Sequence, residues 1–106
     1  MYLFLMQFKA YEEKFEGIVS ALRKIRTRLM GNPDCLKSEV MVSDNRELKV
    51  SYLEIWQSEA SLNAHIRSEL YRDILSIMEW AVEIPAVNFY TITEAGGLDL
   101  ITKLRK

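Results

Sequence analysis

The chain is poor in the residues that form cross-links, metal clusters and membrane spans. Its 106 residues include one cysteine, one histidine, two prolines and four glycines. The single cysteine, Cys35, excludes an intrachain disulfide and a cysteine metal cluster, and it fits a reducing, cytoplasmic setting. No apolar run approaches the roughly 18 residues that a membrane-spanning helix needs. The opening MYLFLM lacks the basic region and cleavage site of a signal peptide.

The charge is nearly balanced, with 14 basic and 15 acidic residues and a formal net charge of −1. A nucleic-acid-binding protein usually carries a clear basic excess, so we expect no nucleic-acid partner. The basic run RKIRTR, residues 23–28, is typical of the solvated face of a helix.

Hydrophobic periodicity predicts elements in the order β-α-β-β-α-β. Both faces of the first strand are apolar, the second and third strands alternate, and the helices carry apolar residues at spacings of three and four. The predicted strands span residues 2–9, 35–42, 47–56 and 86–93, and the predicted helices span residues 12–30 and begin again at residue 58.

Turn and cap residues mark the ends of these elements. The sequence SDNR, residues 43–46, is good turn chemistry and predicts an antiparallel hairpin. Ser58 is a plausible helix N-cap, and Ser68 is another, so the second helix is expected to bend or break near Arg67. Gly96 and Gly97 separate a short apolar tail.

This order predicts an α+β fold of the split βαβ, ferredoxin-like type, with helices on one face of an antiparallel sheet. Residues 1–95 form the predicted domain, and residues 96–106 form a tail that we expect to pack on a partner subunit. Apolar residues of the open sheet face would be exposed in a monomer, which predicts a homodimer with its sheets face to face. These residues include Leu3, Leu5, Leu53 and Ile55.

Two segments together resemble a known family. They are NPDCLKSEVMVSDN, residues 32–45, and LEIWQSEASLNAHIRSELY, residues 53–71. A turn cysteine, a hairpin, a strand that ends Glu-x-Trp and a helix with an acidic-Ala-hydrophobic stretch and a histidine resemble the antibiotic biosynthesis monooxygenase domain. The matching positions are Cys35, Glu54, Trp56, Glu59, Ala60, Leu62 and His65; Asp34 stands where the family commonly has glycine.

The resemblance implies a dimeric α/β barrel with a pocket between sheet and helices. Some members oxidise quinols or polyketide anthrones with molecular oxygen and use no metal, flavin or haem. Others degrade haem, but Leu75 stands where that branch has its haem-ligating histidine. We therefore expect no cofactor and no bound metal.

His65 is the candidate catalytic residue, since histidine has an unperturbed pKa near ~6.5 and suits a general base. The alternative is a half-buried histidine that bonds a backbone group and holds its helix. Trp56, Tyr52 and Tyr71 are candidates for the aromatic wall of a substrate pocket, although core packing is the commoner role for a Trp at the end of a strand. Glu54 lies on a largely apolar face and needs a partner, so we expect it to orient His65 or a backbone group, or to cap the following helix.

Asn88 and Tyr90 share a parity on the last strand and are further candidates for substrate contacts. The leading hypothesis is a cytoplasmic homodimer that oxidises a quinol or small aromatic phenol with oxygen and without a cofactor. The alternative is a non-catalytic dimeric module of the same fold that binds a small ligand.

Overall fold

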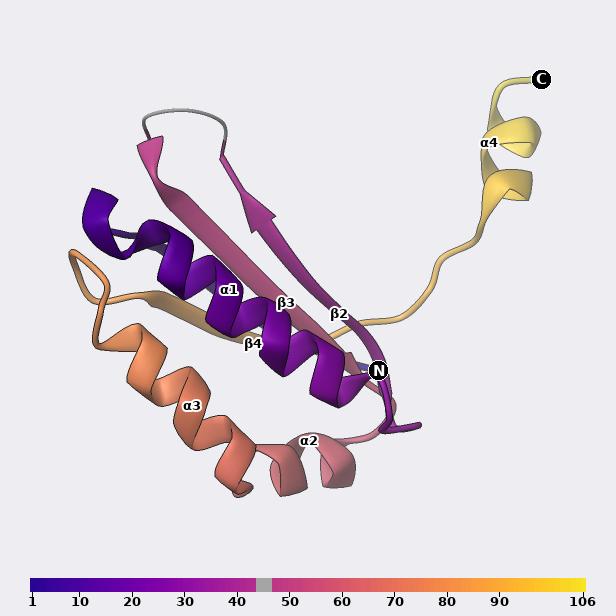
Figure 1. Ribbon diagram of the computed structural model, residues 1–106. Coiled ribbons are helices and arrows are strands. Elements are labelled where there is room, and N and C mark those ends of the chain that lie inside the picture. Colours follow the sequence, from indigo (N-terminus) through magenta and orange to yellow (C-terminus); the bar gives the residue numbers. More distant parts are fainter. Residues whose placement is uncertain (44–46) are drawn as a thin grey trace.

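The computed structural model describes residues 1–43 and 47–106 (Figure 1). Its elements follow the predicted order and add one short helix in the tail. They are β1 (Tyr2–Lys9), α1 (Glu12–Leu29), β2 (Cys35–Val42), β3 (Lys49–Trp56), α2 (Glu59–Ile66), α3 (Glu69–Met78), β4 (Ala86–Thr91) and α4 (Leu98–Leu104).

The strands form one antiparallel sheet in the order β2-β3-β1-β4. Helices α1 and α3 cover one face of this sheet (Figure 1). The predicted ferredoxin-like, split βαβ fold is therefore confirmed. The sheet is open within one chain and does not close into a barrel.

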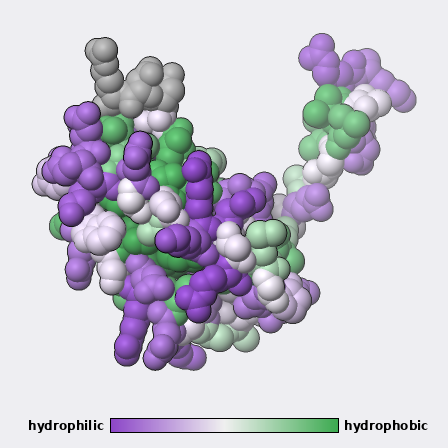
Figure 2. All heavy atoms as spheres, in the orientation of Figure 1, coloured by the Kyte–Doolittle hydropathy of each residue, from purple (hydrophilic) through white to green (hydrophobic). Residues whose placement is uncertain are grey.

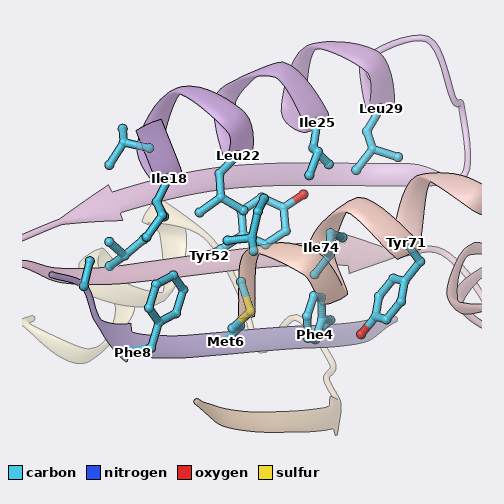
Figure 3. Packing of buried hydrophobic residues seen from close by; sticks show 14 of the residues in the cluster. Phe4, Met6, Phe8, Ile18, Leu22, Ile25, Leu29, Tyr52, Tyr71 and Ile74 are labelled. Atoms are coloured by element: carbon cyan, nitrogen blue, oxygen red, sulfur yellow. The ribbon is translucent and has the colours of Figure 1, made fainter. Parts of the chain in front are cut away.

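The core fills the layer between sheet and helices (Figure 3). Alternate residues of β1 point into this layer because side chains alternate across a strand. Phe4 and Met6 are fully buried there, and apolar residues of α1 at helical spacing pack in the same core. The buried residues of α1 are Ile18, Val19, Leu22, Ile25 and Leu29.

Helix α1 also carries charges that match its dipole, with Glu12 and Glu13 in the first turn and Arg26 and Arg28 in the last. Arg26 connects the helix to the sheet, since its Nε donates a hydrogen bond of 2.8 Å to the carbonyl oxygen of Ser38 in β2.

The predicted break in the second helix is confirmed, and serines form both of its caps. Ser58 and Ser61 form a reciprocal capping box at the start of α2. Ser68 caps α3 by accepting from the backbone nitrogen of Tyr71, and its hydroxyl donates to the carbonyl oxygen of His65 at 2.6 Å. One serine thus ends α2 and begins α3.

The third strand begins two residues later than predicted, at Lys49. Leu48 has a φ of 55°, in the left-handed region that costs a residue with a side chain about 1–2 kcal/mol. An extended strand therefore begins only after Leu48. The hairpin itself is confirmed by the antiparallel pairing of β2 with β3, while residues 44–46 of its predicted turn lie outside the described residues.

The tail forms a short helix, α4, that the sequence analysis did not predict. Leu98, Ile101 and Leu104 are more than half exposed on it. Figures 1 and 2 show α4 standing apart from the rest of the chain. Across the described residues, no helix combines the length and apolar character needed to cross a bilayer.

The packing of α3 makes a matched pair of stability predictions. Ile74 is fully buried and Leu75 is 50% exposed on the same helix. Ile74→Ala should lower the free energy of unfolding by about 2–5 kcal/mol, because it leaves a cavity in the core. Leu75→Ala should change it by about 0.5 kcal/mol or less. Urea unfolding measures both, and equal losses would contradict the assignment of α3's buried face.

Candidate functional site

A buried carboxylate, Glu54, lies at the centre of the candidate site. It is on β3, fully buried, and on the sheet face that the helices cover. Tyr52 donates to Oε2 at 2.6 Å, and Nε1 of Trp56 donates to Oε1 at 3.0 Å. Such donors offset the cost of burying a carboxylate.

His65 provides the third contact to this carboxylate, from α2. Its Nε2 lies 2.8 Å from Oε1 and 3.1 Å from Oε2 of Glu54. The imidazole stacks on Trp56 with ring centroids 4.6 Å apart, and Tyr71 meets it edge-on at 5.3 Å. His65 is therefore held on two sides by aromatic rings and at one nitrogen by a carboxylate.

The predicted aromatic residues thus lie around His65, but their side chains are buried and packed against one another and do not line an open pocket. Tyr52 and Trp56 are 0% and 1% exposed, and their polar atoms are bonded to Glu54. Phe4 closes the cluster below, 5.7 Å from the ring of Tyr71 (Figure 3). Their predicted contact with a substrate remains a prediction, since these side chains leave no open wall.

The negative charge of Glu54 acts on the acidic groups around it. Burial and this charge raise the pKa of the Tyr71 hydroxyl to about 12 and the pKa of the Cys35 thiol to about 11. They also raise the pKa of Tyr52 far above its ordinary range. All three groups therefore stay protonated at neutral pH, and Tyr52 remains a hydrogen-bond donor.

Two members of the site were missed in the sequence. The Oγ of Ser38 lies 3.0 Å from the hydroxyl oxygen of Tyr52, and Phe4 packs on both tyrosines. The parity of β2 gives a signal for Ser38, because Ser38, Val40 and Val42 alternate on one face. The alternation of β2 does not reveal that the hydroxyl of Ser38 contacts Tyr52 on β3.

Asn88 and Tyr90 are not brought to this cluster. They pair with Leu5 and Leu3 of β1, whose side chains point to the open face of the sheet. Phe89 instead shares the covered face and stacks on Phe4 at 5.2 Å. Asn88 and Tyr90 therefore lie on the sheet face opposite to His65, and their position does not support the predicted role in substrate contact.

A hollow of about 340 Å³ has His65 in its wall. Its wall also includes Arg28, Asn32 and Ala64. A larger hollow of about 860 Å³ runs along α1 and contains none of the predicted site residues. Within residues 1–43 and 47–106, no three side chains of the types His, Cys, Asp and Glu cluster in a way that suits a metal ion.

Comparison with known proteins agrees with this fold. The family model described as antibiotic biosynthesis monooxygenase matches residues 1–76. No curated protein matches the chain in sequence. A solved structure of an antibiotic biosynthesis monooxygenase is 18% identical with a TM-score of 0.74, over 89% of this chain and 100% of that one.

Two further structures have the same likeness. A conserved protein of Methanosarcina mazei is 19% identical with a TM-score of 0.76, over 87% of this chain and 92% of that one. Rv0793 of Mycobacterium tuberculosis is 16% identical with a TM-score of 0.76, over 90% of this chain and 98% of that one. Identities this low show the shared fold, while the family match covers β1 to α3. The chain belongs to the antibiotic biosynthesis monooxygenase family.

The raised pKa of Cys35 gives a test of the charge on Glu54. The thiolate is the reactive form, so a pKa of about 11 in place of 9.0 should slow alkylation by iodoacetamide at pH 8 roughly 100-fold. Glu54→Gln removes the charge and should move the midpoint of the pH–rate profile downward. Glu39→Gln, an exchange on the same sheet that leaves Glu54 charged, should leave the midpoint unchanged. An unchanged midpoint in Glu54→Gln would contradict an effect of the Glu54 charge on this thiol, since burial alone would then account for the raised pKa.

The same shift affects stability at high pH. A thiol whose pKa is raised on folding contributes stability that is present below pH 9 and is lost as the pH rises toward 11. The free energy of unfolding should therefore fall over this window, and Cys35→Ala should show a smaller fall than the wild type.

Proposed function

We propose that the chain is a monooxygenase that oxidises a quinol or small aromatic phenol with molecular oxygen, without a cofactor. His65 removes a proton from the substrate hydroxyl. The observation that carries this proposal is the contact between Nε2 of His65 and the buried carboxylate of Glu54. Family membership supports oxygen chemistry of this general kind.

The Glu54 contact prepares His65 for this task. A carboxylate accepts only, so Nε2 carries a hydrogen and donates it. In the neutral ring the lone pair is then on Nδ1, which becomes the basic nitrogen. When the ring takes up a proton, the negative charge of Glu54 is already beside it and stabilises the imidazolium.

The reaction balances without an added reductant. Proton loss to His65 leaves a phenolate, which passes one electron to oxygen and gives superoxide and a substrate radical. The two recombine at a ring carbon that bears hydrogen, the resulting peroxide anion takes the proton back from His65, and the hydroperoxide loses water. One oxygen atom ends as a new carbonyl and the other as water, so that a phenol and oxygen yield a quinone and water.

The packing of the cluster favours a second candidate function, a non-catalytic module that binds a small ligand. Glu54 has all its partners within the protein, and among the described residues every fully buried side-chain nitrogen and oxygen is hydrogen-bonded. A network of this kind also forms where its task is to hold α2 on the sheet.

Oxygen uptake separates the two functions. His65→Gln keeps an N–H donor for Glu54 but removes the base, so turnover should fall by about 10²–10⁴-fold in a folded protein. Leu75→Ala, on the exposed face of α3, should retain turnover. The assay is oxygen consumption with a panel of reduced quinols in metal-free buffer. Uptake by the wild type no faster than autoxidation, or full activity of His65→Gln, would refute the catalytic proposal.

We also propose that the chain works in the cytoplasm as a homodimer. The open face of the sheet carries apolar side chains, including the half-buried Leu3, Leu5, Leu53 and Ile55. A contiguous apolar face of this kind is typical of an interface. The exposed apolar residues of α4 would find cover on the partner subunit, which would close the barrel from two open sheets.

A charge placed at the centre of this face tests the dimer. Leu53→Lys should yield a monomer in light scattering, because an unpaired ammonium group would be buried between the sheets. Leu75→Lys makes the same exchange on exposed α3 and should remain a dimer. A monomeric wild type, or a dimeric Leu53→Lys protein, would refute the proposed interface.

A further inference from the structure

The hollow beside α2 is formed by two parts of the chain that are distant in sequence. One side is the end of α1 and the turn that follows it, with Arg28, Asn32 and Asp34. The other side is α2 and the start of α3, with Ala64, His65 and Leu70. The hollow thus lies outside the packed aromatic cluster and touches the cluster only through His65.

His65 lines this hollow, and one of its two ring nitrogens is free of hydrogen bonds within residues 1–43 and 47–106. Nε2 is bonded to Glu54, and Nδ1 has no hydrogen-bond partner among the described residues. Across the same residues, every fully buried side-chain nitrogen and oxygen has a partner. Nδ1 is therefore in contact with solvent, although the residue as a whole is only 5% exposed. His65 is also one of the residues that line the hollow.

The lining of the hollow suits a small polar aromatic molecule. Leu29, Leu70 and Ala64 give it apolar surface, and Arg28 and Asp34 add a cation and a carboxylate. Its volume of about 340 Å³ is near the lower end of the about 300–1,000 Å³ of small-molecule sites. A molecule of one ring fits within that volume.

We infer that this hollow is the ligand-binding site of the protein, and that a one-ring hydroxylated aromatic molecule binds there with its hydroxyl donating to Nδ1 of His65. The chemical class of this ligand rests on the proposed function. The accessibility of Nδ1 of His65 rests on the structure alone. Tyr52 and Trp56 then act behind the imidazole, as supports, and the ligand meets neither of them. Glu54 is a positioning residue, because it fixes which nitrogen is free to accept.

Ala64 provides the means to block the site. It is exposed on α2 and lines the hollow. Ala64→Leu fills the space with a good helix former and leaves the cluster untouched. Ala60→Leu is the matched control: Ala60 is also exposed on α2, lies one turn earlier outside the hollow, and its new side chain leans toward the helix N-terminus and away from it.

The first measurement is the nitrogen NMR spectrum of the single imidazole, recorded without oxygen while hydroquinone is added. The Nδ1 signal should shift in the wild type and in Ala60→Leu, and the shift should be lost in Ala64→Leu. No shift in the wild type, or an equal shift in Ala64→Leu, would overturn the inference. If Ala64→Leu misfolds by circular dichroism, Ala64→Gln fills the same space with a polar side chain.

The second measurement is carbethoxylation by diethyl pyrocarbonate, which modifies a free imidazole nitrogen. The wild type and Ala60→Leu should react, and Ala64→Leu should be protected; equal reaction of all three would overturn the opening at Nδ1. Neither measurement depends on turnover. A hydroquinone shift without oxygen uptake would therefore refute the proposed oxidation and support the site.

Discussion

The structure depends on one buried negative charge. Glu54 is fully buried on a sheet face whose buried neighbours are mostly apolar or aromatic, where an unpaired carboxylate would cost several kcal/mol. Donors from β3 and α2 satisfy it, and the Tyr52 hydroxyl extends the network to Ser38 in β2. A single carboxylate thus ties an edge strand, a central strand and a helix together. Aliphatic residues would fill the same space, but they would not fix the orientation of the imidazole.

Most of the fold was predictable because the strongest signals were local. The alternation of β3 and the spacing of α1 each identify an element and its buried face. The serines at positions 58 and 68 identify the caps. The failures have physical causes as well. Leu48 takes a left-handed conformation that its side chain disfavours, so its tertiary surroundings and not its own propensity delay β3. The N-cap residue of α4 is Gly97, which has no side chain to cap the helix, so the sequence carried no cap signal for it.

The sequence allowed most residues of the candidate site to be named, but it did not reveal how their side chains contact one another. Position on β3 places Tyr52, Glu54 and Trp56 on one face, and helical spacing brings His65 toward that face. Asn88 and Tyr90 share a parity too, but which parity faces the helices depends on the pairing of β4 with β1. That pairing is a long-range contact, and nothing local to β4 reports it. The same holds for the free nitrogen of His65, which depends on where α2 docks.

The shortness of α2 gives the cluster a dynamic consequence. Helix α2 has eight residues, fewer than the roughly 12–15 at which an isolated helix becomes even marginally stable in water. Its two serine caps and the bond between His65 and Glu54 hold it in place. Local unfolding of α2 and separation of the imidazole from the carboxylate are therefore one event. Amide hydrogen exchange along α2 reports how often that event occurs, and so how often the buried charge meets water.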